Sequence, residues 1–298
     1  MVKGKSFSDK VMAIVAYAIS IFLCIIMIYP VWNIIVISFN DGLDTLKGGL
    51  TIWPRMFTLE NYKAVFEDSR LINAFKISIL STVIVTVCAT LVTSMFAYAV
   101  SRKTLKFRRT YMKICTLTMY LNAGLIPAFL LIQNLGLVNS FWVYVFPPLF
   151  SAYNMIIYRS FFDNLPDGLL EAAQIDGAGQ YRTFFSIVLP VSKPVIATLA
   201  LFTAVTQWND WFVGAIYIKD SNLIPLQTLL RQIINSNATS QLMSQMGGTA
   251  AEKMAEASLT TRALSAATIV VATVPIIVVY PFLQKYFASG VMLGAVKG

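Results

Sequence analysis

Residue types on which many enzymes depend are missing or scarce in this 298-residue sequence. It contains no histidine, which excludes a Ser-His triad and any metal site with histidine ligands. Cys24, Cys88 and Cys115 stand singly in apolar stretches without paired spacing, so we interpret them as packing residues. No G-x-x-x-x-G-K-[ST] phosphate loop is present, so the chain cannot hydrolyse ATP by that route.

Charged residues are also few, and apolar residues dominate. Only 12% of the residues are charged and 57% are hydrophobic, unlike the composition of an average soluble domain. A helix needs about 20 mostly apolar residues to cross a bilayer. The sequence therefore predicts an all-α membrane protein in which residues 1–298 form a single transmembrane domain with six spans. These spans are expected at about 11–38, 73–100, 111–132, 141–158, 195–218 and 263–286.

The first span begins after Lys3, Lys5 and Lys10, a start that a secretory signal peptide would share. Its apolar run continues past Pro30, well beyond the roughly 7 to 15 residues of a signal core. No small-residue cleavage site ends the run. We therefore expect an uncleaved span.

Basic residues set the expected orientation, because cytoplasmic segments retain Lys and Arg. With the N-terminus inside, fourteen of the 23 basic residues fall on the inner side and nine on the outer side. Acidic residues show the opposite bias, with five inside and eight outside. We expect both termini in the cytoplasm. The net charge of +9 is interpreted as a result of topology and contact with anionic membrane lipid, with no nucleic-acid partner.

Two outer segments are long, at about 39–72 and 219–262. The second has apolar residues at helical spacing over 226–234 and then two glycines at 247–248, which predicts a short surface helix followed by a flexible stretch. Contact with a molecule outside the cell and a solvated connector are both compatible with this pattern. On the inner side, the basic segment 101–113 is expected to anchor the topology.

A charged segment at 163–194 interrupts the apolar pattern. Five charged residues lie between Asp163 and Pro190. At about 2.5 to 3.5 kcal/mol for each charge near the centre of a span, burying all of them would cost on the order of 12 to 17 kcal/mol. This segment is therefore expected in water on the cytoplasmic side.

Local signals in this segment predict a helix-turn-helix. Pro166–Asp167 supplies a start for the first helix, and good helix formers follow. Gly177 and Gly179 break the run, and the second helix continues until Pro190 ends it. Ala172–Ala173 would give the first helix a smooth side that a partner protein could approach closely. An ordinary amphipathic loop is the alternative.

The same segment carries a family resemblance. Its pattern matches, position by position, the EAA loop of permease subunits in bacterial ABC importers, and the matching residues are Glu171, Ala172, Ala173, Gly177, Ile187, Leu189 and Pro190. Residues 208–210 (WND) and 294–298 (GAVKG) are similar to the maltose-type, carbohydrate-uptake permeases. The stretch 121–147 resembles a Gram-positive branch associated with complex, often pectin-derived, oligosaccharides.

The resemblance implies a type I importer permease fold in the bacterial plasma membrane. Segment 163–194 would hold a coupling helix that sits on a cytoplasmic ATPase and transmits its movement. The residues implied in this coupling are Glu171, Ala172, Ala173, Asp176, Gly177, Ile187, Leu189 and Pro190. The implied partners are a second homologous permease, two ATPase subunits, an extracellular sugar-binding protein and an oligosaccharide. The chain would bind no cofactor, and the partner ATPase would bind ATP and Mg.

Polar residues inside spans usually face a cavity or a neighbouring helix. Candidates for a substrate path are Asn122, Asn154, Gln207, Trp208, Asn209, Asp210 and Trp211. Aromatic rings beside amides and a carboxylate suit sugars, because rings stack on pyranose faces while polar groups meet hydroxyls. The same residues are also compatible with tryptophans at a membrane interface and with a helix cap at Asp210.

Two alternatives from other classes have less support. A stand-alone, ion-coupled secondary transporter is expected to show inverted repeats and several functional intramembrane charges, and only Asp210 qualifies. An integral-membrane enzyme needs convergent acid-base or metal groups, and the sequence shows none.

Overall fold

The computed structural model describes residues 7–45, 47–49, 52–121, 123–245, 262–279 and 281. In these residues every regular element is helical, and the only strand-like pairing is an isolated bridge between Asn40 and Phe57. The chain divides into two compact units, residues 1–68 with 230–273, and residues 69–229 with 274–298. The all-α prediction is confirmed for the described part of the chain.

The first unit begins with one long apolar helix, α1 (Phe7–Ser38). Its stretch Val11–Ser38 is apolar enough to cross a membrane, and none of its most apolar window is buried against the rest of the chain. A helix that is apolar all round and uncovered is suited to lipid. Two short helices follow, α2 (Gly42–Thr45) and α3 (Glu60–Glu67).

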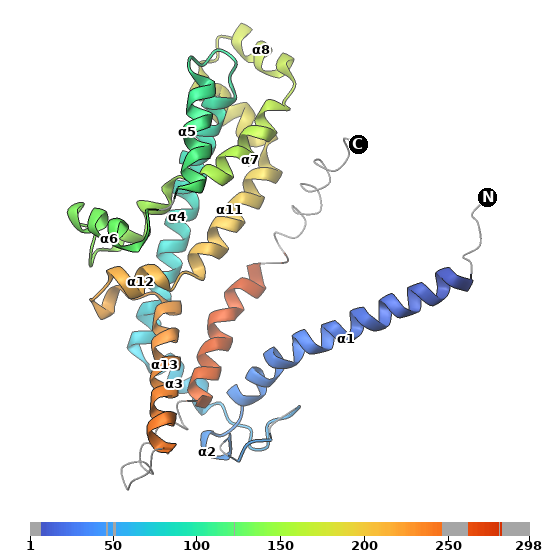
Figure 1. Ribbon diagram of the computed structural model, residues 1–298, viewed down its shortest axis with the longest axis vertical. Coiled ribbons are helices and arrows are strands. Elements are labelled where there is room, and N and C mark those ends of the chain that lie inside the picture. The colour runs from blue at the N-terminus through green and yellow to red at the C-terminus, as the bar shows by residue number, and fades with distance from the viewer. Residues whose placement is uncertain are drawn as a thin grey trace. The chain divides into compact units, whose positions relative to one another are not determined.

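The second unit is built around α4 (Ser69–Ser101), α7 (Ala152–Asp163) and α11 (Lys193–Trp208), which lie alongside one another (Figure 1). The buried side of α4 recurs at intervals of three or four positions, and many of its residues are small, among them Ala74, Ser78, Ser81, Ala89 and Ala97. Small side chains let helix backbones approach closely inside a membrane. This pattern explains why α4 packs against two neighbours.

Shorter helices fill the rest of this unit. They are α5 (Arg108–Tyr120), α6 (Leu125–Asn134), the 3₁₀ turns η1 (Phe141–Tyr144) and η2 (Pro147–Leu149), α12 (Phe212–Tyr217) and η4 (Ser221–Leu223). Helix α13 (Leu226–Gln245) begins in this unit and continues into the other. Its presence confirms the helix expected in the long segment 219–262, although the helix is longer than predicted.

Three of the expected spans are not continuous helices. The span at 111–132 is divided between α5 and α6, with Gly124 at a φ of 83° between them. The span at 141–158 starts as 3₁₀ turns, because prolines at 147 and 148 cannot donate backbone hydrogen bonds. The span at 195–218 breaks between α11 and α12.

Among the described residues, three helices are long and apolar enough to cross a membrane alone: Val11–Ser38, Ser69–Ser101 and Arg262–Val279. Two bent helix pairs raise the number to five if each pair counts as one span. The last expected span is described as far as Val279, and residues 247–248 and 294–298 lie outside the described part.

Candidate functional site

The segment 163–194 forms the expected helix-turn-helix. Its first helix is α8 (Asp167–Ile175), which lies beyond the ends of α5 and α7 (Figure 1). The second comprises α9 (Gln180–Thr183), a π-helical turn η3 (Phe184–Val188) and α10 (Leu189–Val191). It ends one residue after Pro190, as the sequence predicted.

Gly177 closes α8 through a specific backbone turn. Its φ is 74°, and its N–H donates to the carbonyl of Gln174 at 3.0 Å, while the N–H of Ala178 donates to the carbonyl of Ala173 at 2.9 Å. These two bonds define a Schellman motif, in which a glycine adopts the left-handed conformation just beyond the helix end. A Cβ on Gly177 would meet no atom within 4 Å, so backbone conformation alone explains the glycine.

The faces of α8 differ from the expectation in one respect. Ala173 is buried together with Leu170, whereas Glu171 and Ala172 are exposed. The two alanines therefore do not form one smooth outer side. Ile175 is 86% exposed, and it gives the outer side of α8 an apolar residue for which no role was expected from the sequence.

Helices α9 and η3 are anchored in the second unit. Phe184 and Val188 are buried in the same core cluster as Tyr98 of α4, and the rings of Tyr98 and Phe184 lie 5.3 Å apart. The hydroxyl of Tyr98 donates to Oε1 of Gln180 at 3.0 Å. Phe185, next to Phe184, is about half exposed.

The π-helical turn lies directly before Pro190. The N–H of Leu189 donates to the carbonyl of Phe184, five residues back and not four. Since proline has no N–H, the carbonyl of Ser186 also loses its ordinary α-helical donor. Beyond Val191 the chain bends by 86° into α11. The link between segment 163–194 and α11 is thus a widened turn followed by a sharp bend.

Two ion pairs join this segment to the basic segment 101–113. Nζ of Lys103 lies 3.1 Å from Oδ2 of Asp167, and Nη2 of Arg108 lies 3.0 Å from Oδ1 of Asp163. From the sequence, the basic segment was expected to anchor the topology, and these pairs were not predicted. The acidic residues at the start of segment 163–194 were the signal that could have identified them.

Asp210, a candidate for the substrate path, caps a helix. Its Oδ1 accepts the backbone N–H of Phe212 at 2.8 Å and that of Val213 at 3.3 Å, at the start of α12. Asn209 donates from Nδ2 to the carbonyl of Val205 at 2.8 Å, at the end of α11. These bonds explain why α11 stops and α12 starts within the expected span.

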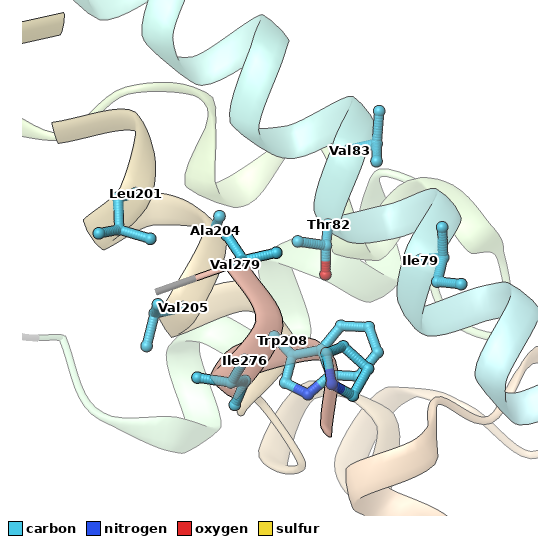
Figure 2. Close-up of a pocket in the computed structure, with 10 residues that line it drawn as sticks. Ile79, Thr82, Val83, Leu201, Ala204, Val205, Trp208, Ile276 and Val279 are labelled. Carbon is cyan, nitrogen blue, oxygen red and sulfur yellow. The ribbon is translucent and has the colours of Figure 1, made fainter. Parts of the chain in front are cut away.

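Trp208 lies in different surroundings from Asp210. It is buried, its ring meets Phe75 edge to face at 5.7 Å, and it lines a cavity of about 190 Å³ (Figure 2). The lining comes from α4, α11 and the helix Arg262–Val279; its residues are Ile79, Thr82, Val83, Leu201, Ala204, Val205, Trp208, Pro275, Ile276 and Val279. Apart from Trp208, only Thr82 brings a polar side-chain atom, so this cavity does not suit sugar hydroxyls.

The other path candidates make separate contacts. Asn154 donates from Nδ2 to Oγ1 of Thr203 at 3.4 Å and so joins α7 to α11. The carbonyl of Trp211 accepts the hydroxyl of Thr228 at 2.8 Å. Gln207 is half-buried in the last turn of α11. Asn122 lies outside the described residues.

Comparison with known proteins supports a transport role for this architecture. A family model described as "Binding-protein-dependent transport system inner membrane component" matches residues 5–293. The polygalacturonan/rhamnogalacturonan transport system permease protein YtcP of Bacillus subtilis (strain 168) is 36% identical, over 97% of this chain and 99% of that protein. Protein LplC of the same organism is 38% identical, over 92% of this chain and 90% of that protein.

A solved structure has the same fold. One chain in the crystal structure of a bacterial ABC transporter involved in the import of the acidic polysaccharide alginate is 28% identical, with a TM-score of 0.85. The match covers 96% of this chain and 100% of that chain. Fold and matches together define an inner-membrane permease subunit of an ABC importer.

The chain belongs to the family of binding-protein-dependent transport system inner membrane components. The identification based on the EAA-type loop is thereby confirmed, and the stand-alone, ion-coupled transporter is set aside. Proteins of this family are permease subunits of the inner membrane, which agrees with several apolar helices able to cross it.

Proposed function

We propose that this chain is the permease subunit of an importer for oligosaccharides that contain uronic acid units. The observation that carries this proposal is the agreement between two relatives that cover nearly the whole chain. One is named for polygalacturonan and rhamnogalacturonan transport, and the other takes part in alginate import. All three polymers contain uronic acids, whose carboxylates distinguish them from neutral sugars.

The proposed topology has six spans with both termini in the cytoplasm, and residues 1–298 form one permease domain. Support comes from the distribution of basic residues and from the family match over residues 5–293. In this topology α8 lies in the cytoplasm, and the segments after α1 and after α12 lie outside.

In the proposed mechanism, α8 sits on a cytoplasmic ATPase subunit, and the second helix transmits its movement into α11. The exposed Glu171, Ala172 and Ile175 would face the ATPase, with Asp176 and Gly177 at the turn. Buried Ala173 would hold α8 to its own chain. Ile187, Leu189 and Pro190 belong to the widened turn that connects the loop to the membrane helix.

The partners follow from this assignment. We propose a second homologous permease, two ATPase subunits that bind ATP and Mg, and an extracellular sugar-binding protein. This chain would bind no cofactor of its own. Gln207, Asn209, Asp210 and Trp211, with Asn154 and Asn122, are the proposed contacts for sugar along the path. Trp208 is left out of this set, because it is buried beside the apolar cavity.

A transport assay in liposomes tests the proposed function. The chain would be purified with its accompanying subunits and reconstituted with the binding protein, and ATP hydrolysis would be measured with oligogalacturonides, alginate oligosaccharides and neutral malto-oligosaccharides. Stimulation by the uronate oligosaccharides supports the proposal. Stimulation by the neutral sugars alone contradicts the substrate class, and purification without an ATPase subunit contradicts the partners.

The coupling role has its own test in the same assay. Glu171→Lys is expected to abolish transport and to weaken retention of the ATPase, because it places the opposite charge on the exposed side of α8. Glu67→Lys, the same substitution at an exposed position of α3, is the matched control and should transport normally. Normal transport by Glu171→Lys would remove the coupling assignment.

A further inference from the structure

The segment after α1 is folded around a buried amide. Asn40 is fully buried, and its Nδ2 donates to Oδ2 of Asp44 at 3.2 Å and to Oγ1 of Thr45 at 3.0 Å, while its Oδ1 accepts the N–H of Met56 at 2.9 Å. Asn61 donates to the carbonyl of Asn40 at 2.9 Å. These bonds fix the strand-like stretch around Met56 against the end of α1.

Arg55 is turned towards this polar interior. Its Nε lies 2.9 Å from Oδ2 of Asp44, and its Nη2 donates to the carbonyl of Asp44 at 2.9 Å. The guanidinium therefore has a carboxylate and a carbonyl as partners, and its charge is compensated within the segment.

The same stretch also carries several exposed apolar side chains. Its large residues are Ile52, Trp53, Met56, Phe57 and Leu59, and all are more than half exposed. Trp53 is the most exposed of them, at 73%. The stretch 52–59 thus combines a compensated charge with five exposed large apolar side chains. Apolar side chains exposed close together often mark a site of contact with a protein or a membrane.

Two contacts place the start of this stretch beside the membrane helix. The indole Nε1 of Trp32 in α1 donates to the carbonyl of Ile52 at 2.9 Å. The rings of Trp32 and Trp53 also meet edge to face, with centroids 6.3 Å apart. Residues 52–53 therefore return along α1 to the level of Trp32, instead of extending away from the end of the helix.

The depth of Trp32 follows from helix geometry. The apolar stretch of α1 spans 28 residues, from Val11 to Ser38. At about 1.5 Å per residue, Trp32 lies about 11 Å from the middle of this stretch, compared with a half-thickness of about 15 Å for the hydrocarbon core. In a centred helix the Trp32–Trp53 pair therefore lies just inside the boundary of the core. Tryptophan is enriched at this level of a bilayer.

We infer that residues 52–59 are an interfacial anchor, whose exposed apolar side chains insert into the lipid leaflet at the C-terminal end of α1. The chemical partner is the boundary between lipid headgroups and acyl chains. The Trp32–Ile52 hydrogen bond sets the depth of the anchor, and the Arg55–Asp44 pair keeps its charge away from the lipid. The anchor fixes the position of α1 along the bilayer normal. This inference goes beyond the proposed function and does not depend on the substrate.

Tryptophan fluorescence of the reconstituted importer tests the anchor. The emission that belongs to Trp53 is obtained as the difference between the parent chain and Trp53→Phe, which retains Trp32 and its hydrogen bond. Lipids with a quencher at carbon 5 of the acyl chain are expected to remove most of this emission. Lipids with a quencher at carbon 12 should remove less of it, and iodide in the water little. Trp208→Phe gives a matched difference for a buried ring that iodide should not reach.

Spin labelling provides a second measurement. With Cys24, Cys88 and Cys115 replaced by Ala, a nitroxide at Met56→Cys should be accessible to oxygen in the lipid, and one at Lys63→Cys should be accessible to a water-soluble nickel complex. Exposure of Trp53 and Met56 to the water-soluble reagents would overturn the anchor. Protection from both lipid and water reagents would also overturn it, since it would show that a protein subunit covers the stretch.

Discussion

The hydroxyl of Tyr98 in α4 donates to the side chain of Gln180 in α9, at 3.0 Å. This bond joins α4 directly to the second helix of segment 163–194, where the rings of Tyr98 and Phe184 are also in contact. Segment 163–194 is therefore held from two directions, through the chain that leads to α11 and through a side-chain bond to α4.

Tyr98→Phe is expected to weaken this second connection. The ring would still pack on Phe184, so only the hydrogen bond is lost, at about 0.5 to 1.5 kcal/mol. The amount of sugar transported per ATP hydrolysed should fall while ATP hydrolysis continues. Tyr181→Phe, at an exposed position one residue after Gln180, is the control, and an equal loss there would contradict the role of Tyr98.

Backbone conformation, and not the available space, should determine which substitutions are tolerated at Gly177. Its φ of 74° is in the left-handed region, and a Cβ would meet no atom. Gly177→Val should strain the turn by about 1 to 3 kcal/mol and impair uptake. Gly177→Asn should retain more activity, since asparagine adopts this conformation more readily. Gly179→Ala is the matched control, with an ordinary φ of −67°, and uptake near the parent rate is expected.

The two ion pairs of the basic segment should differ in strength. Arg108 and Asp163 are only 25% and 33% exposed, so Arg108→Ala should destabilise the purified chain by about 1 kcal/mol or more. Lys103 and Asp167 are largely exposed, and Lys103→Ala should change stability by less than about 1 kcal/mol. Thermal unfolding in detergent at low and high salt measures both. Equal effects of the two substitutions would show that burial does not determine their strength.

Gly214 of α12 is expected to be sterically intolerant. A Cβ there would overlap Oγ1 of Thr228 and lie 2.8 Å from Cδ of Pro225, so the start of α13 would have to move. Gly214→Ala should lower stability by about 1 to 3 kcal/mol. Gly168→Ala in α8 is the control, since its Cβ would meet nothing within 4 Å and alanine favours a helix. Similar melting temperatures for the two variants would contradict the close contact at Gly214.

The folded structure of the segment after α1 should become less stable at acidic pH. The hydrogen bond from Arg55, with those from Asn40 and Lys47, holds the pKa of Asp44 below its usual value despite the desolvation of this carboxyl. A lowered folded-state pKa stabilises the segment above the unfolded pKa of about 3.9, and the contribution is lost as the pH falls through the folded value.

A nitroxide at Met56→Cys should therefore become more mobile as the pH falls below about 4. Asp44→Asn should remove this pH dependence, because it removes the titrating group. Glu60→Gln provides a control at an exposed position and should keep the pH dependence. An unchanged acid transition in Asp44→Asn would assign the effect to another group.

Periodicity and turn signals predicted some elements well and others poorly. The helix-turn-helix at 163–194 was predicted because Pro166, Gly177 and Pro190 act through local backbone geometry, which sequence reveals directly. The first two spans were predicted correctly because each of them is one continuous apolar helix, which a hydropathy pattern reveals. The span at 195–218 was predicted as continuous because hydropathy does not register a side-chain cap such as Asp210.

Contacts between distant segments could not be predicted in the same way. The bond between Tyr98 and Gln180 joins residues 82 positions apart, and no local pattern marks it. The inward turn of Ala173 was missed because an isolated alanine pair does not reveal which neighbour will cover it. The return of Trp53 to Trp32 depends on the hydrogen bonds of Asn40, which only the folded segment shows.

The π-helical turn at Phe184–Val188 has the geometry of an α-helix into which one extra residue has been inserted. One residue corresponds to about 100° of rotation in a helix with 3.6 residues per turn. Everything before this turn, including α8, is therefore rotated about the helix axis compared with an unbroken helix of the same sequence. Deleting a single residue within the turn would redirect the exposed side of α8 without changing any residue on it. The number of residues in this turn, and not only their identity, decides which way Glu171 faces.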